Sequence, residues 1–563
     1  MRYLLDGGDM LQTLVDTCRE IGVAPFLSFR LNDGHHTRDL AAALEQGRPT
    51  PKMARHYWEN YQAFRIGPDV TDWGESVFDW AIPEVRDYKF SLMEEACRNY
   101  DIAGLELDFL RHWVRFSRST PLDERQAITT DFVRRVRKML DRTAAERGLP
   151  HRWLCVRVPA AQEVRPEQGI DLQDFARVGV EMVNLSYSYF TWQDRSIEHA
   201  VREIDNPHVA VYAEMTHCTL TGKATAGSGT QPYLRTTDAQ FYTTAELAHS
   251  QGARGVSLFN FPYYRYHVTD SIGPFYEPPF HVLPRLKDHE FLRNQSRWYF
   301  ISSGRNDPIL GDRQLPRIVK RSRPETLTLD VATGVSIRGE GIFRVRSDEP
   351  IADREIEVTF NGQPLSRTGF IKKPLPHPYD DTWLGTPDEV VCYTVPTTLT
   401  LAATNRIEVN VKRGERVRVI YADLVHGHPR IAEGARGNSL ALDGQSMLEI
   451  RDSAKLPHGS QGTTLTIWVN PYILDGQQQM IAAKNRYSLN EREGGVMIDK
   501  DNRFRLYLWQ GKWVTIAAEE MPRPGHWHQV GVLLRPGRAE LWVNGRPVGD
   551  AKLEQPIPQT SAP

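Results

Sequence analysis

The stretch at residues 104–113, Gly-Leu-Glu-Leu-Asp-Phe-Leu-Arg-His-Trp, alternates like a buried strand but carries two acids, an arginine and a histidine. Successive side chains of a strand point to opposite faces, so Leu105 and Leu107 share one face while Glu106 and Asp108 share the other. In a parallel barrel, one face meets the helix layer and the other faces the interior. We therefore expect the leucines to pack against helices and the two carboxylates to point inward.

The first 300 residues alternate short apolar runs with stretches of helical spacing. The six runs are Val23 to Phe29, Ile102 to Phe109, Trp153 to Ala160, Met182 to Tyr189, Val209 to Met215 and Gly255 to Phe261. The helical stretches include Leu11 to Ile21, Val85 to Asn99, Asp123 to Glu146 and Thr243 to Gln251. This alternation predicts a parallel sheet with helical crossovers.

A (β/α)8 barrel needs eight strands. We therefore predict that residues 1–300 form a TIM-type barrel lacking its first two strand–helix units, with an open six-stranded sheet as the less favoured alternative. The missing front would leave an unpaired edge, which we expect to aggregate or to recruit a partner.

After residue 300 the helical spacing stops and two all-β domains are predicted. Residues 301–430 form the first β-sandwich, in which the stretch 355–365 has an Asn-Gly hairpin signal between two strands. A linker leads to a second sandwich of the jelly-roll type at residues 437–552, and a proline-rich polar tail at 553–563 is expected to be disordered. The fold class is therefore multidomain, a TIM-type α/β barrel followed by two β-sandwiches.

Composition excludes several classes of function. The chain has 563 residues and a formal net charge of −2, which offers no attraction for nucleic acid or an anionic membrane. No apolar run is long enough to span a bilayer, and residues 1–9 lack the pattern of a signal peptide. The five cysteines are scattered singly, which argues against a disulfide framework or a cysteine-based zinc site.

Polar and aromatic residues follow the predicted strands, where the catalytic groups of such barrels lie. They are Arg30, Asn32, Asp33, His35 and His36 after the first strand, Tyr187, Tyr189 and Trp192 after the fourth, Glu214 and His217 at the fifth, and Asn260, Tyr263 and Tyr264 after the sixth. Rings stack on sugar faces while polar groups bind hydroxyls, so this rim suits a neutral, polyhydroxylated ligand.

Two carboxylates inside one barrel raise the pKa of at least one of them, as a general acid requires. For Asp108, near the mouth, the functional interpretation is favoured. Glu106 lies one layer deeper, and for it a structural pairing with an inward arginine such as Arg157 is equally open. Asp33, His35 and His36 could ligate a metal, but adjacent histidines on a loop are a weak signal, so we predict no metal and no cofactor.

Three motifs resemble the glycoside-hydrolase-like, family-ten-like (β/α)8 proteins: SFRLNDGHH (28–36), FDWAIPEVRDYKFSLMEEACRNYDIAGLELDFLRHW (78–113) and GARGVSLFNFPYY (252–264). The resemblance implies that the first motif lies on the third barrel strand and Glu-Leu-Asp on the fourth. Retaining glycosidases of the wider clan carry an acid/base on the fourth strand and a nucleophile on the seventh. These roles would fall on Asp108 or Glu106 and on Glu214. The clan usually shows Asn-Glu on the fourth strand, so the choice between Asp108 and Glu106 stays open.

The last domain resembles laminin-G-like, concanavalin-A-type sandwiches. The motifs are NSLALDGQSMLEI (438–450), LTIWVNP (465–471) and HWHQVGVLLRPGRAELWVNGRPVG (526–549). The resemblance implies a module that binds glycans or packs as a structural appendage.

Together these observations predict a glycoside hydrolase acting on a polysaccharide or oligosaccharide. Asp108 would be the general acid or base, Glu214 the nucleophile or base, and Glu106 would tune the site. The expected sugar contacts are Arg30, Asn32, Asp33, His35, Arg111, His112, Tyr187 and Asn260. The alternatives are a catalytically inactive glycan-binding protein and a polysaccharide lyase that uses Tyr187 or a histidine as base. A secreted or periplasmic location is expected from the substrate class.

Overall fold

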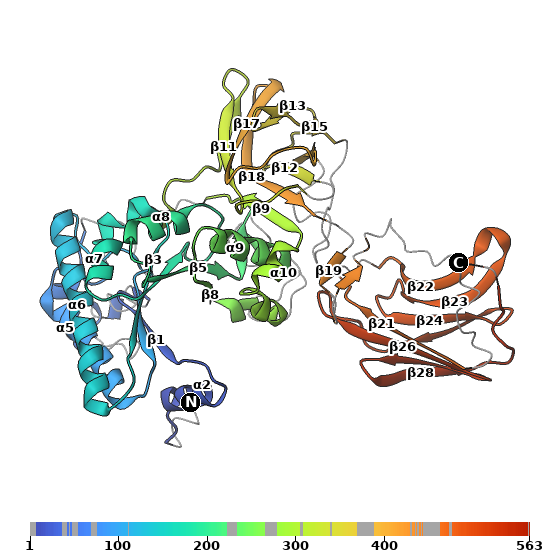
Figure 1. Cartoon of the computed structure of the whole chain (residues 1–563), viewed down its shortest axis with the longest axis horizontal. Helices are drawn as coiled ribbons and strands as arrows, with labels where there is room; N and C mark the ends of the chain where they lie inside the picture. The colour runs from blue at the N-terminus through green and yellow to red at the C-terminus, as the bar shows by residue number, and fades with distance from the viewer. Residues whose placement is uncertain are drawn as a thin grey trace.

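The computed structural model shows a parallel α/β sheet followed by β-sandwich sheets (Figure 1). It describes residues 7–35, 42–43, 45–47, 55–68, 76–110, 112–221, 233–264, 278–304, 308–337, 341–368, 388–427, 431–433, 435, 438–440, 442, 462–471, 474, 476–560 and 562. Among them, no helix combines the length and the hydropathy needed to cross a bilayer. The five cysteines are free, and four of them are buried.

The α/β domain contains a six-stranded parallel sheet in the order β1-β2-β3-β4-β5-β8. Its strands are β1 (Phe26–Arg30), β2 (Gly104–Asp108), β3 (Trp153–Pro159), β4 (Met182–Ser186), β5 (Ala210–Thr216) and β8 (Gly255–Phe259). All six predicted strands are confirmed. The expected barrel lacking two strand–helix units is confirmed in part: in the described part of the chain β1 and β8 end the pairing order, so the sheet is an open half-barrel and not a closed TIM barrel. Six strands do not make up the eight-stranded circle that closes such a barrel.

Helices cover this sheet and bury its apolar face. They are α2 (Met10–Glu20), α4 (Arg55–Phe64), α5 (Pro83–Asn99), α6 (Leu122–Arg147), α7 (Leu172–Arg177), α8 (Ser196–Ile204), α9 (Asp238–Ser250) and α10 (His289–Arg293). Leu105 and Leu107 are fully buried in the core cluster that includes residues of α5 and α6. The predicted facing of β2 is therefore confirmed. A short antiparallel pair, β6 (Cys218–Leu220) and β7 (Tyr233–Arg235), follows β5.

The first β-sandwich pairs a six-stranded sheet with a four-stranded sheet. The larger sheet has β9 (Arg297–Ile301), β10 (Arg317–Lys320), β12 (Gly341–Ser347), β15 (Ser366–Arg367), β16 (Val390–Val395) and β18 (Arg416–His426). The smaller has β11 (Glu325–Asp330), β13 (Glu355–Phe360), β14 (Gln363–Pro364) and β17 (Thr404–Arg413). The expected domain boundary at residue 300 falls inside β9, which pairs with β18 and so belongs to the sandwich.

The α/β domain and the first sandwich pack directly on one another. Met215 and Phe241 of the α/β domain share one buried cluster with Trp298, Phe300 and Tyr421 of the sandwich. This shared core fixes β9 against α9 (Figure 1).

The last domain has two four-stranded antiparallel sheets. One contains β21 (Thr463–Val469), β26 (His528–Arg535), β27 (Arg538–Val543) and β28 (Arg546–Lys552), and the other β22 (Gln479–Arg486), β23 (Glu491–Ile498), β24 (Phe504–Trp509) and β25 (Trp513–Ala517). A separate pair, β19 (Ile431–Glu433) with β20 (Asn438–Leu440), precedes it.

The tail that was expected to be disordered makes hydrogen bonds to this last domain. The Gln555 N–H donates to Oε1 of Gln510 at 2.8 Å, and the Thr560 N–H donates to Oε1 of Glu493 at 2.6 Å. These side chains satisfy the backbone of a polar segment that has little apolar surface of its own.

Candidate functional site

A polar network crosses the inner face of the half-barrel from β1 to β8. Its members come from every strand of the parallel sheet: Ser28 of β1, Glu106 and Asp108 of β2, Cys155 and Arg157 of β3, Asn184 and Ser186 of β4, Glu214 of β5 and Ser257 of β8. The alternation of β2 therefore directs both of its acids to this face, as the sequence predicts.

Arg157 is the centre of the network, and it binds two carboxylates at once. Its Nη1 lies 2.9 Å from Oδ1 of Asp108, while its Nε and Nη2 lie 2.6 and 2.7 Å from the two oxygens of Glu214. Ser186 also donates to Glu214 and accepts from Nη2 of Arg157 at 3.0 Å. The guanidinium lies 4.1 Å from the ring centroid of Phe259. Arg157, Asp108 and Glu214 are all buried. The ion pairs between the arginine and the two carboxylates offset part of the free-energy cost of removing these charges from water.

Glu106 is half-buried, in contrast to Asp108 and Glu214. It accepts a hydrogen bond from Oγ of Ser28 at 2.6 Å and one from Nδ2 of Asn184 at 3.4 Å. The same Nδ2 lies 3.3 Å from Oε2 of Glu214, so Asn184 bridges two acids. The structural pairing of Glu106 with Arg157 is not observed, because Arg157 extends toward Asp108 and Glu214 instead.

Burial and charge shift the pKa values in this network. Burial raises the pKa of Glu214 above its ordinary value, although Arg157 and Ser186 partly offset that effect. Burial lowers the pKa of Arg157, but the charges and hydrogen bonds of Glu214 and Asp108 outweigh it and raise the pKa. Burial also raises the pKa of Cys155, and the nearby charge of Glu106 adds to this. The arginine thus stays charged while Glu214 holds a proton more readily than an exposed glutamate.

Two of the expected sugar contacts lie in the interior instead. Asn32 is buried, and its Nδ2 donates to the carbonyl oxygens of Phe78 and Val114, each at 3.0 Å. Tyr187 is buried, donates to Asp194 and stacks on Trp192 with ring centroids 5.0 Å apart. Both side chains are committed to the packing of loops, so the expected placement of these two residues on the rim is corrected.

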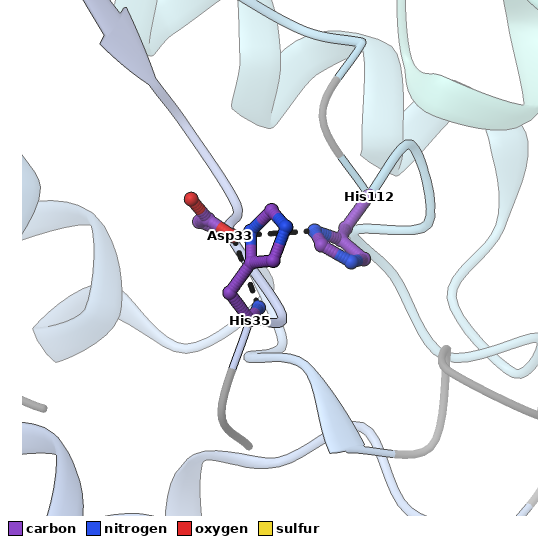
Figure 2. A group of neighbouring side chains, drawn as sticks. All are labelled: Asp33, His35 and His112. Atoms are coloured by element: carbon purple, nitrogen blue, oxygen red, sulfur yellow. Dashed lines mark hydrogen bonds and ion pairs between the residues drawn. The ribbon is translucent and has the colours of Figure 1, made fainter. Parts of the chain in front are cut away.

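Other expected rim residues do gather at the carboxyl ends of β1 and β2 (Figure 2). Oδ1 of Asp33 lies 2.5 Å from Nδ1 of His35 and 3.5 Å from Nδ1 of His112, and Oδ2 lies 2.9 Å from Nη1 of Arg30. Burial raises the pKa of Asp33, but the neighbouring His112 ring and the hydrogen bonds from the His35 backbone and Arg30 outweigh it and hold the pKa well below its usual range.

The last two expected sugar contacts have different outcomes. Asn260 follows β8, half-buried, in a left-handed conformation with φ of 52°. Arg111 lies outside the described residues, as does His36.

Sequence reasoning missed Arg157 as the partner of Asp108 and Glu214, and it missed Asn184 and Ser186 altogether. The signal was present: Arg157 and Asn184 are polar residues inside otherwise apolar strands, at adjacent positions of the β3–β4 register. A polar residue in a buried strand must find a partner on the face to which it points.

A second polar and aromatic group lies on the sheet β22-β23-β24-β25 of the last domain. The rings of Trp509 and Trp513 meet edge to face across β24 and β25 with centroids 4.9 Å apart, and the Tyr487 ring centroid lies 6.4 Å from that of Trp513. The guanidinium of Arg492 lies 4.7 Å from the Trp509 ring. Tyr487 is 60% exposed and both tryptophans are half-buried, so all three rings keep some contact with solvent.

Solved structures similar to this chain include several carbohydrate-related proteins. A glycoside hydrolase family 18 N-acetylglucosaminidase from Paenibacillus barengoltzii has 14% identity and a TM-score of 0.26, with 34% of this chain and 76% of that chain covered. A chitinase-like agglutinin from Robinia pseudoacacia has 12% identity and a TM-score of 0.23, covering 32% and 69%. An alpha-amylase from Anoxybacillus has 11% identity and a TM-score of 0.29, covering 72% and 79%. TM-scores of this size carry no functional argument.

No curated protein matches the chain. The family-ten-like resemblance of residues 1–300 therefore stays a prediction. A family model does match the last domain, over residues 442–563, and the match includes the tail. That C-terminal part of the chain is similar to the Concanavalin A-like lectin/glucanases superfamily, in agreement with the resemblance of its sequence motifs.

Proposed function

We propose that this chain hydrolyses a glycosidic bond in a polysaccharide or oligosaccharide. The observation that carries the proposal is the group of three carboxylates, Glu106, Asp108 and Glu214, linked by Arg157 and Asn184 on one face of a parallel sheet. Glycosidic hydrolysis needs one carboxyl group that carries a proton and one that is ionised. This network offers different surroundings to its three acids, which is how a protein separates those two roles.

Glu106 takes the direct role in this proposal. A group that transfers a proton to the glycosidic oxygen must come within hydrogen-bond distance of it. Glu106 is the least buried of the three acids, whereas Asp108 and Glu214 are buried and bound to Arg157. Glu214 is the second carboxyl group, and Asn184 bridges it to Glu106. Asp108 then holds Arg157 in position. Sequence reasoning favours the opposite order, with Asp108 acting directly and Glu106 tuning the site.

The glycan contacts in this proposal come from two places. Arg30 and Asn260 flank the network at the ends of β1 and β8 and offer hydrogen bonds to hydroxyl groups. In the last domain, Tyr487, Trp509 and Trp513 offer aromatic rings for stacking on sugars, and the Arg492 guanidinium lies over the Trp509 ring. A module that holds a long glycan would raise its local concentration at the α/β domain.

A second candidate function is glycan binding without catalysis. The specific observation in its favour is that Arg157 forms buried ion pairs with both Asp108 and Glu214. Such ion pairs also occur where their role is only structural. Tyr187 does not suit the role of catalytic base in the polysaccharide lyase alternative, because its hydroxyl is buried and donates to Asp194.

The test is product release from a panel of plant, algal and microbial polysaccharides. The chain, its Glu106→Gln variant and its Asp108→Asn variant are compared, with the exposed Asp131→Asn as a matched control. We expect at least a hundredfold loss of turnover in Glu106→Gln with glycan binding retained, and no change in the control, because general acid–base catalysis contributes roughly 10²–10⁴-fold. Full activity of Glu106→Gln would remove its role. Binding without turnover by the unmodified chain would favour the second candidate.

A further inference from the structure

We propose that Asp33, His35 and His112 bind a divalent transition-metal ion of the zinc class. The inference does not depend on glycosidic hydrolysis, and nothing in the carboxylate network requires it. Sequence reasoning weighed His36 as the third ligand, whereas the structure brings in His112 from the segment after β2.

The three side chains converge on one point (Figure 2). A potential ligand atom from each lies within 4.8 Å of the others, the spacing that a single ion can bridge. The oxygen Oδ1 of Asp33 lies between the two histidines, 2.5 Å from Nδ1 of His35 and 3.5 Å from Nδ1 of His112. The two imidazole rings are perpendicular, with centroids 5.2 Å apart. An ion bound by one oxygen and two imidazole nitrogens would have its remaining coordination positions open to water or to another ligand.

The backbone holds these groups in place before any ion binds. The His35 N–H donates to Oδ1 of Asp33 at 3.0 Å, which closes a tight turn after β1. His112 has a left-handed φ of 52°, a conformation that costs a non-glycine residue about 1 kcal/mol or more. A Cβ on Gly34 would lie 3.0 Å from the His112 ring and 2.7 Å from Val77, so a larger residue there would force a neighbouring side chain to move. A strained histidine packed against a glycine is a feature that folding alone does not require.

The second oxygen of Asp33 is already oriented by a neighbour. Nη1 of Arg30 binds Oδ2 at 2.9 Å, and the ammonium of Lys89 donates to the Arg30 carbonyl oxygen at 3.1 Å. The carboxylate is thus fixed so that Oδ1 faces the histidines. Partners of this kind orient metal ligands and contribute to affinity.

The ligand types decide the class of ion. Calcium and magnesium prefer oxygen ligands, whereas two imidazoles with one carboxylate suit zinc, cobalt or iron. Without the ion, hydrogen bonds take its place: His35 pairs with Asp33, and the Gly34 N–H donates to Nδ1 of His112 at 2.7 Å. A bound ion would replace these bonds and link the segment after β1 to the segment after β2.

The test is calorimetric titration of Zn²⁺ into the full chain after treatment with a chelator. His35→Ala is the principal variant, because His35 is 39% exposed and its removal leaves the core intact. Asp33→Asn is the second variant. His281→Ala is the matched control, since His281 pairs with Asp238 at 2.6 Å as His35 pairs with Asp33, but no third ligand joins that pair among the described residues. Circular dichroism verifies that each variant is folded.

We expect one Zn²⁺ per chain, bound at least tenfold more weakly by His35→Ala and Asp33→Asn and unchanged by His281→Ala. Co²⁺ in place of Zn²⁺ should give visible absorption bands that His35→Ala loses. The proposal is overturned if the chain binds no Zn²⁺, or if folded His35→Ala and Asp33→Asn bind it as tightly as the unmodified chain does. Equal weakening by His281→Ala would assign the binding to scattered surface histidines and would also overturn it.

Discussion

Arg157 is the residue on which the charge balance of the inner face depends. Removing it leaves Asp108 and Glu214 buried without their counter-ion, and breaking such a pair typically costs about 3–5 kcal/mol. We expect Arg157→Met to lower the free energy of unfolding by that amount in urea titrations. Arg134→Met is the control, because Arg134 and Asp131 form a largely exposed pair for which about 1 kcal/mol or less is expected. Equal losses in the two variants would contradict this account.

His528 of β26 makes the last domain sensitive to acid. Burial lowers the pKa of His528 below its ordinary value of 6.5, and the neutral ring accepts a hydrogen bond from the Arg523 N–H at 3.1 Å. A depressed folded-state pKa means that the stability contribution is present above pH 6.5 and is lost as the pH falls through the folded-state value. Tryptophan fluorescence in urea should show this loss below pH 6.5. His528→Gln should weaken that pH dependence, and an unchanged dependence would point to other groups.

At the scale of elements, strand β9 is bonded to the α/β domain as well as to its own sheet. The side chain of Gln193 accepts from the Phe300 N–H at 2.9 Å and donates to the Trp298 carbonyl oxygen at 3.2 Å, and Thr243 accepts from the Trp298 N–H at 2.9 Å. These side chains satisfy backbone groups that a buried strand edge would otherwise leave unpaired.

Gln193→Ala should therefore destabilise the junction of the two domains. Two buried backbone groups would lose their partners, at about 1–3 kcal/mol for each unsatisfied group. Gln173→Ala is the control, since Gln173 makes an exposed hydrogen bond to Arg177 within α7. Hydrogen exchange should show faster exchange of the Phe300 amide in Gln193→Ala. An amide that stays protected to the same degree would show that Gln193 does not satisfy it.

At the scale of the whole molecule, sequence patterns predict the facing of residues within strands but not the paths of loops or the pairing of strands. Alternation inside a strand fixes which face a residue occupies, so the facing of Glu106 and Asp108 could be predicted, although their partners across the sheet were missed. Asn32 and Tyr187 follow their strands, and beyond a strand end the loop path decides the direction of a side chain. Six strands with an unpaired edge could also be predicted, whereas the pairing order of those strands could not, because strand periodicity carries no information on which strands pair.

The shared core cluster predicts that the α/β domain and the first sandwich unfold together. Trp298 is buried in that cluster and donates from its indole to Oδ2 of Asp423 at 3.0 Å, while the guanidinium of Arg344 lies 5.3 Å from its ring. Truncation of a buried tryptophan to alanine costs about 3–5 kcal/mol. In calorimetry, Trp298→Ala should lower the Tm of one transition that contains both domains.

The last domain gives the internal reference for this experiment, because its core cluster contains only residues from 469 onward. Its transition should stay at the same temperature in Trp298→Ala. Two separate transitions for the α/β domain and the first sandwich, with only one of them shifted, would mean that each domain folds on its own. A single shifted transition would mean that the α/β domain and the first sandwich form one cooperative unit, joined by the core cluster that they share.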